Sequence, residues 1–217
     1  MRPFLLGLVL FLSSCSLLVP AGHVSDFKQV RDVSYEILMP GNSCSAVAIS
    51  PTYLLTAGHC ISELGQEVTV IDTDKGERYL VGKAIAIKDD DVVDLAIIVL
   101  QDATVPNYAS VTSQEPLQDE IVVVVGYPLG ITEVVTVGRF QGFINGHYLV
   151  TAQSTFGNSG GGVFVIRDGG YQLLGIASYG AATAYGQFIE HLIFFVTNHT
   201  IEDFLGYDSE KEEYGLN

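Results

Sequence analysis

Basic residues and cysteines are scarce in this chain of 217 residues. It has 10 Lys and Arg against 25 Asp and Glu, so its formal net charge is −15. This balance argues against a basic patch for nucleic acid or for anionic lipid, and it predicts a solvated acidic surface. The sequence shows no metal-ligand spacing and no internal repeat, so we expect neither a metal, nor another cofactor, nor a repeat architecture.

Residues 1–21 have the features of a secretory signal peptide. One positive charge precedes an apolar run from Phe4 to Leu12, which is too short for a convincing membrane span. Two cleavage sites compete. The tetrapeptide LSSC, which ends at Cys15, is similar to the lipobox of bacterial lipoproteins, whereas cleavage after Ala21 would release a soluble protein. We favour a lipid on Cys15, hence an exported protein of the bacterial envelope whose only membrane contact is that anchor.

The cysteine count fits export. Once Cys15 is lipidated or removed, Cys44 and Cys60 remain. An even pair in an exported chain predicts one disulfide. The bridge would fix the backbone beside His59, which is useful if the imidazole must keep its position.

Short apolar runs rich in Val, Ile, Tyr and Phe fill the rest of the chain, and they predict strands. Six runs lie within residues 32–100 and six within residues 120–196. The segment between them, residues 101–119, is polar and contains two prolines, as a linker would. Near-continuous runs such as IVVVV favour closed barrels over sheets with one face in solvent. We therefore predict an all-β fold of two similar units.

One helix is expected near the end of the chain, at residues 199–206. Asn198 or Thr200 would cap its start, acids fall in its first turn, and Gly206 follows its end. Residues 207–217 are then a charged, frayed tail.

The stretch TFGNSGGGVF, residues 155–164, places a single serine, Ser159, among glycines. Such a cluster is ordinary turn chemistry between two strands. It equally suits a backbone that presents a nucleophile, because glycine permits positive φ and close approach by another chain. The choice depends on a base and an acid elsewhere in the sequence.

A candidate base and a candidate acid are both present. His59 ends the run YLLTAGH and precedes Cys60. Asp94 begins a strand whose next six residues are all apolar, so its carboxylate needs a partner, and a histidine N–H is a suitable one. The charge run at residues 89–91 is better explained as a solvated loop.

The motifs LLTAGHC, DLAII and GNSGG resemble those of trypsin-like serine proteases, and the resemblance covers residues 32–206. It implies two six-stranded antiparallel β-barrels, the chymotrypsin-like fold, with a C-terminal helix and a catalytic triad between the barrels. The triad would be His59, Asp94 and Ser159, and the N–H groups of Gly157 and Ser159 would form the oxyanion hole. The forms GNSGG and DLA are closer to the HtrA-like and other bacterial branches than to digestive trypsins.

This resemblance implies a serine endopeptidase that acts on protein or peptide substrates through an acyl-enzyme intermediate. An esterase with the same triad and a catalytically inert binding protein on the same fold are the alternatives. The oligomeric state has no signature in the sequence.

The sequence gives weaker signals for substrate specificity than for the triad. The stretch GIASYG resembles the substrate-binding strand of the family, which implies that an extended peptide pairs with Ser178, Tyr179 and Gly180. Gln153, six residues before Ser159, is expected near the base of the primary specificity pocket. Glutamine cannot supply the carboxylate that Lys or Arg would need there, so we expect a small or apolar residue before the scissile bond.

Asn158 departs from the digestive members of the family. Those members have an aspartate at this position, which pairs with an α-amino group freed by cleavage of a propeptide. A neutral amide cannot compensate a buried ammonium. We therefore expect the loop at residues 157–159 to be held by its own hydrogen bonds or by substrate, without N-terminal processing.

Lipidation is testable. When the chain is expressed in a bacterium with its own signal, we expect it to partition with membranes and to incorporate labelled palmitate, because lipoprotein modification adds more than one acyl chain. A Cys15→Ser variant should incorporate none. A wild-type protein that is wholly soluble and begins at Gly22 would contradict the lipoprotein hypothesis.

Overall fold

The computed structural model describes residues 27–72, 78–153, 155–182 and 188–209. The predicted signal peptide, with Cys15, and tail residues 210–217 lie outside the described residues. The strands before the linker are β1 (Ser34–Met39), β2 (Asn42–Ala48), β3 (Tyr53–Thr56), β4 (Glu67–Asp72), β5 (Arg78–Asp89) and β6 (Asp94–Leu100). Those after it are β7 (Ile121–Gly126), β8 (Val134–Ile144), β9 (His147–Val150), β10 (Gly162–Arg167), β11 (Gly170–Ala182) and β12 (Phe188–Thr197).

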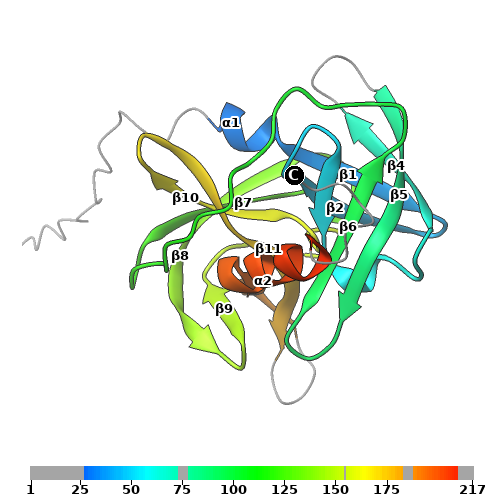
Figure 1. The fold of residues 1–217 in the computed structure, drawn as a ribbon. Helices are drawn as coiled ribbons and strands as arrows, with labels where there is room; N and C mark the ends of the chain where they lie inside the picture. Colours follow the sequence, from blue (N-terminus) through cyan, green and yellow to red (C-terminus); the bar gives the residue numbers. More distant parts are fainter. Residues whose placement is uncertain (1–26, 73–77, 154, 183–187, 210–217) are drawn as a thin grey trace, which may run out of the picture.

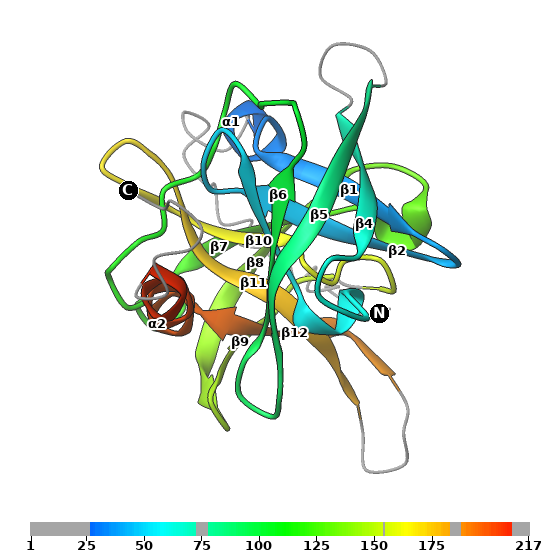
Figure 2. The same cartoon turned by 45° about the vertical axis from the view of Figure 1, so that its right-hand side comes forward.

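These strands close into two antiparallel barrels. The strand order is β1-β2-β3-β6-β5-β4 in the first barrel and β10-β11-β12-β9-β8-β7 in the second. Figures 1 and 2 show the first barrel, coloured blue to green, beside the second, coloured green to orange. The prediction of an all-β fold with two six-stranded barrels is confirmed.

The near-continuous apolar runs have a specific cause, which is burial on both faces of a strand. In β6, Ala96 and Ile98 belong to the core of the first barrel, whereas Leu95 and Ile97 belong to a separate apolar cluster. That cluster also contains side chains of β7, β10, β11 and β12, so it lies between the barrels. Alternate residues of one strand thus enter two different cores.

The terminal helix is longer than predicted. Helix α2 (Asn198–Ser209) begins one residue before the expected start and includes Gly206 and the first residues of the expected tail. Its start is capped by Thr197, whose Oγ1 accepts a hydrogen bond from the Thr200 N–H at 3.2 Å. The Asn198 side chain instead donates to the Thr112 carbonyl at 2.8 Å and is fully buried, which is why it does not cap.

A second, short helix, α1 (Lys28–Arg31), precedes β1 and was not predicted. Helix α2 packs on the second barrel, against β11 and β12, and Figure 1 shows it in red. Its residues Ile201 and Phe204 enter the apolar cluster between the barrels. Within the described residues, no helix is long and apolar enough to cross a membrane.

The predicted disulfide is confirmed. Cys44 of β2 and Cys60 are bridged, with their Cα atoms 6.3 Å apart. Both residues are buried in the core of the first barrel. The bridge therefore joins β2 to the segment that carries His59.

The disulfide should contribute measurably to stability. We expect the double substitution Cys44→Ala with Cys60→Ala to lower the free energy of unfolding by about 3 kcal/mol, because a closed loop of this length restricts the unfolded chain. Urea denaturation of the variant and of oxidised wild type measures the difference. An unchanged denaturation midpoint would contradict this expectation.

Candidate active site

The His59 imidazole is held at two points by one carboxylate. His59 lies in the short 3-10 helix η1 (Gly58–Cys60), directly after β3. Its backbone N–H donates to Asp94 Oδ1 at 2.8 Å, and its ring Nδ1 lies 2.8 Å from Asp94 Oδ2. Asp94 opens β6, the strand that pairs with β3. The two residues are therefore brought together by neighbouring strands of one barrel.

Glycine is required just before His59. A Cβ at Gly58 would lie 2.5 Å from the Lys88 carbonyl oxygen and 3.0 Å from the Leu95 nitrogen. The close approach of η1 to β5 and β6 thus depends on the missing side chain. This approach brings the His59 ring to Asp94.

Asp94 has a further partner that the sequence did not indicate. The Ser178 hydroxyl, on β11 of the other barrel, donates to Asp94 Oδ2. Burial acts to raise the pKa of Asp94, but hydrogen bonds from the His59 ring, the Ser178 hydroxyl and the His59 N–H lower it. Asp94 is therefore a buried, ionised acceptor.

The hydrogen bond between His59 and Asp94 shifts the pKa of His59 upward, opposite to its effect on Asp94. Its hydrogen bond to Asp94 raises the pKa of His59 above 6.5, and burial opposes this shift without cancelling it. When the ring is neutral, the proton stays on Nδ1 beside the carboxylate. Nε2 is then left as a hydrogen-bond acceptor.

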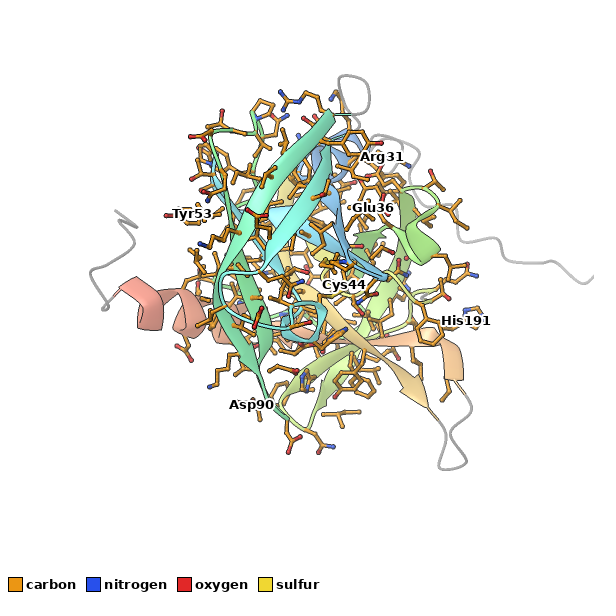
Figure 3. The ribbon with its side chains drawn as sticks, turned by 90° about the vertical axis from the view of Figure 1, so that its right-hand side faces the viewer. Arg31, Glu36, Cys44, Tyr53, Asp90 and His191 are labelled. Atoms are coloured by element: carbon orange, nitrogen blue, oxygen red, sulfur yellow. A yellow bond between two sulfur atoms is a disulfide. The ribbon has the colours of Figure 1, made fainter. Side chains whose placement is uncertain are left out.

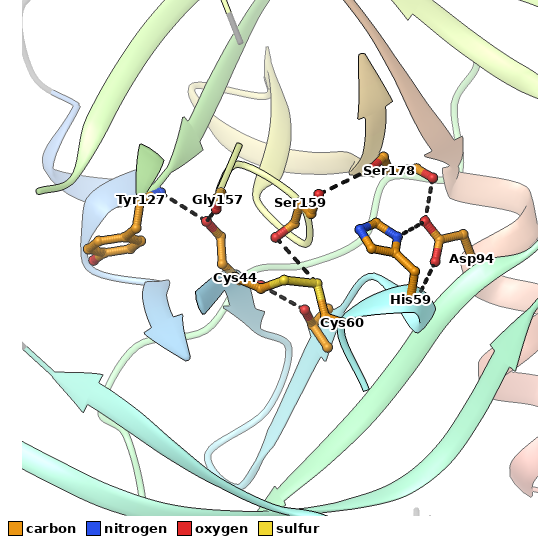
Figure 4. The surroundings of a disulfide bond; sticks show 10 residues. Cys44, His59, Cys60, Asp94, Tyr127, Gly157, Ser159 and Ser178 are labelled. Carbon is orange, nitrogen blue, oxygen red and sulfur yellow. Dashed lines mark hydrogen bonds and ion pairs between the residues drawn. A yellow bond between two sulfur atoms is a disulfide. The ribbon is translucent and has the colours of Figure 1, made fainter. Parts of the chain in front are cut away.

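Ser159 belongs to the second barrel and faces the His59 side of the first. Figure 4 shows Ser159, His59 and Asp94 beside the Cys44–Cys60 disulfide, with Ser178 next to Asp94. The Ser159 hydroxyl donates to the Ser178 carbonyl at 3.3 Å. The structure thus brings the three predicted residues into one region.

The backbone carbonyls of the loop at residues 156–159 are all occupied. The Phe156 carbonyl accepts from the Leu129 N–H at 2.7 Å, and the Asn158 carbonyl accepts from Gly161 at 2.9 Å. The other two carbonyls both accept from Ser45 of β2. The Gly157 carbonyl accepts from the Ser45 hydroxyl, and the Ser159 carbonyl accepts from the Ser45 N–H. Every peptide group in the loop is therefore fixed in orientation.

Unlike the carbonyls of this loop, the backbone N–H groups of Gly157 and Ser159 are left without a partner by the described residues. Among the described residues, neither has a hydrogen-bond acceptor. A trans peptide points its N–H away from its carbonyl, so the bond from Leu129 to Phe156 turns the Gly157 N–H in the opposite direction. These two backbone donors, separated by Asn158, are suited to bind an anion or a developing negative charge.

Gly157 cannot carry a side chain in this conformation. Its φ is 95°, which L residues rarely adopt. A Cβ there would also lie 2.5 Å from the Tyr127 carbonyl oxygen and 2.7 Å from the Leu129 nitrogen. The 3-10 helix η2 (Pro128–Gly130) thus packs directly against the loop.

A cavity of about 460 Å³ opens beside Ser159. The first barrel contributes residues 42–44 and His59 to its lining, and the second contributes residues 155–159 and 177–180 together with Ile193. No acidic side chain lines it among the described residues. The predicted residues Ser178, Tyr179 and Gly180 are thus all at this cavity.

Gln153 is not in that lining. It is exposed and borders a separate hollow with Thr136 and His191. Figure 3 shows His191 at the outer edge of the molecule, whereas Cys44 lies near its centre. The structure thus places Gln153 outside the lining of the cavity beside Ser159, in the segment that follows the end of strand β9 at Val150.

No group of His, Cys, Asp and Glu side chains within the described segments could hold a metal ion. The reactive groups gathered at this site are the Ser159 hydroxyl, the His59 imidazole, the Asp94 carboxylate and the two backbone donors. Sequence reasoning missed Ser45, Leu129 and the bond from Ser178 to Asp94. Each of these contacts joins residues far apart in the chain, and no local motif marks it.

The comparisons agree with this fold. A protein-family model described as a trypsin-like peptidase domain matches residues 44–176, more than half of the chain. A sequence search of curated proteins finds no match.

Among solved structures, the active form of the Rv3671c protease from M. tuberculosis is 22% identical, with a TM-score of 0.65, and the match covers 82% of this chain and 81% of that one. The serine endoprotease from Yersinia pestis is 19% identical, with a TM-score of 0.65, and the match covers 82% of this chain and 63% of that one. At these identities the structural likeness establishes the fold.

The pKa of His59 can be measured directly. We expect its imidazole to titrate with a midpoint above 6.5, because Asp94 stabilises the protonated ring. In an Asp94→Asn variant the midpoint should fall, since the ring loses its charged partner and keeps its burial. NMR titration of the imidazole protons of both proteins tests this. A wild-type midpoint at or below 6.5 would contradict the proposed pairing.

Proposed function

This chain belongs to the trypsin-like peptidase family, and we propose that it is an exported serine endopeptidase that uses Ser159, His59 and Asp94. The observation that carries the proposal is the buried Asp94 bonded to His59 Nδ1 at 2.8 Å. Beside them lies a serine whose loop presents two backbone N–H groups that find no acceptor in the part of the chain that the structure describes. These are the parts that acyl transfer needs.

The proposed reaction begins at the Ser159 hydroxyl. When substrate binds, this hydroxyl turns from the Ser178 carbonyl toward His59 Nε2, which takes its proton as Ser159 Oγ attacks the scissile carbonyl. Asp94 stabilises the imidazolium and keeps Nδ1 protonated. The Gly157 and Ser159 N–H groups stabilise the oxyanion of the tetrahedral intermediate.

The intermediate then collapses to an acyl-enzyme. His59 returns its proton to the leaving amine, and the new amino terminus departs. A water molecule attacks the ester carbon of acyl-Ser159, with His59 again acting as base and then as acid. The carboxylic product leaves, and the Ser159 hydroxyl is restored.

An extended substrate has a natural place beside β11. Strand β10 pairs with β11 only as far as Ile176, so Ser178, Tyr179 and Gly180 leave an edge open on the Ser159 side. We propose that a peptide adds to this edge as a further strand. The neutral lining, with Ala177 and Ile193, supports a small or apolar residue before the scissile bond.

Two further parts of the proposal concern the setting. The apolar N-terminal run and the LSSC tetrapeptide support export and a lipid on Cys15. The net charge of −15 supports a protein that binds neither nucleic acid nor anionic lipid through a basic patch. The substrate is then a protein or peptide of the envelope or outside the cell.

The three residues should act as one unit. We expect Ser159→Ala to reduce kcat by about 10⁴- to 10⁶-fold while the protein still folds, and His59→Ala to do the same. The double variant should be little worse than either, because each single substitution already disables the same step. Rates are measured on the peptide that a mixed library shows to be cleaved best.

A fluorophosphonate probe separates the alternatives. Wild type should be labelled at Ser159, and Ser159→Ala should not. Absence of labelling in folded wild type would favour an inert binding protein, and labelling with cleavage of esters only would favour an esterase. Normal peptidase activity in purified Ser159→Ala would overturn the assignment of the nucleophile.

A further inference from the structure

We propose that Ser45 is a positioning residue that holds the loop at residues 156–159 in the conformation that directs the Gly157 and Ser159 N–H groups into the cavity. This inference rests on the proposed function, because it assigns the loop a part in acyl transfer. Ser45 lies on β2 of the first barrel, next to Cys44, whereas the loop belongs to the second barrel.

The Ser45 hydroxyl both donates and accepts a hydrogen bond where β2 meets the second barrel. It donates to the Gly157 carbonyl at 2.8 Å and accepts from the Tyr127 N–H at 2.9 Å. The residue is buried, with an exposed fraction of 1%. Because little room is left for water, an alanine at this position would leave the Gly157 carbonyl and the Tyr127 N–H without their partner. Figure 4 shows these two bonds beside the disulfide.

The Ser45 backbone holds the same loop at a second place. Its N–H donates to the Ser159 carbonyl at 2.7 Å, and its carbonyl accepts from the Thr56 hydroxyl at 2.7 Å. A Cβ at Gly160 would lie 2.0 Å from the Ser45 carbonyl oxygen, so the two barrels touch here through backbone. The backbone bonds would survive substitution of Ser45, and the hydroxyl alone would be lost.

The peptide that the hydroxyl holds lies between the two proposed oxyanion donors. The orientation of the Gly157–Asn158 peptide sets the direction of the Gly157 N–H relative to that of Ser159, because the two N–H groups flank it. Rotation of this peptide would turn one donor away from the other. A displacement of about 1 Å in such a group can reduce a rate by about 100-fold.

Within the described residues, no ion pair holds the loop at residues 156–159 in place. No ion pair there involves residues 155–161. Asn158 is neutral, and its N–H bonds weakly to the Thr155 carbonyl at 3.3 Å. The loop therefore depends on neutral hydrogen bonds from outside itself, and Ser45 supplies two of them.

The test compares Ser45→Ala with Ser45→Thr, which keeps the hydroxyl, and with Ser34→Ala as a matched control. Ser34 is another buried serine of the first barrel, and its hydroxyl donates to the Val30 carbonyl at 2.7 Å. We expect Ser45→Ala to lower kcat by about 10- to 100-fold with KM little changed, because the oxyanion forms only after substrate is bound. Ser34→Ala should lose stability and keep its kcat.

A peptidyl boronic acid, built on the best library peptide, reports on the tetrahedral state itself. Its inhibition constant should rise across the Ser45 variants in proportion to KM/kcat. Binding of the uncleaved peptide should be unchanged when Ser45→Ala is added to a Ser159→Ala background. Inhibition constants that do not change, or a kcat for Ser45→Ala equal to that of Ser34→Ala, would overturn the inference.

Amide hydrogen exchange tests the contact without any need for activity. In Ser45→Ala, the amides of Tyr127, Asn158 and Gly161 should exchange about ten-fold faster or more than in Ser34→Ala. Unchanged exchange would overturn the positioning role even in an active enzyme. A third outcome separates the two proposals. If exchange is faster in Ser45→Ala but the wild-type protein cleaves no peptide and takes no fluorophosphonate, the contact is established and the proposed function is wrong.

Discussion

The contact between β2 and the loop at residues 156–161 is the constraint on which the candidate site depends. The first barrel carries His59 and Asp94, and the second carries Ser159 and the two backbone donors. Neither barrel holds a complete site. At the junction, Ser45 bonds to the Gly157 and Ser159 carbonyls, and Gly160 admits the β2 backbone because it has no side chain. A shift of one barrel against the other would separate His59 from Ser159.

The same junction is supported from several sides. The Cys44–Cys60 disulfide ties the strand that carries Ser45 to the segment that carries His59. Ser178 of the second barrel donates to Asp94 of the first, so the acid is also held from both barrels. Behind these polar contacts, the apolar cluster between the barrels excludes water from one face of β6 and β7. Polar bonds set the orientation here, and apolar burial supplies the larger part of the stabilisation.

Asp94 and His59 differ in burial and in the direction of their pKa shifts. Asp94 is nearly inaccessible and has three hydrogen-bond donors, whereas the side chain of His59 is 41% exposed. The hydrogen bonds to the buried Asp94 lower its pKa and keep it charged in spite of its burial. The more accessible His59 is the partner that can exchange a proton with a substrate. This division separates orientation from proton transfer, which is what a general base held by a carboxylate needs.

The sequence by itself determined the fold class and the identity of the candidate residues. Runs such as IVVVV and DLAIIVL indicated strands, and the order of the motifs around His59, Asp94 and Ser159 indicated the family. Two cysteines left after the predicted signal peptide indicated the bridge. Only the tertiary structure decided the hydrogen bonds of Ser45 to the loop at residues 156–159, the bond from Ser178 to Asp94, and the place of Gln153 outside the cavity. Ser45 and Gly157 are 112 residues apart, and no local pattern records which carbonyl a buried hydroxyl will meet. Periodicity and motifs are properties of neighbours along the chain, whereas these contacts exist only after two barrels have packed together.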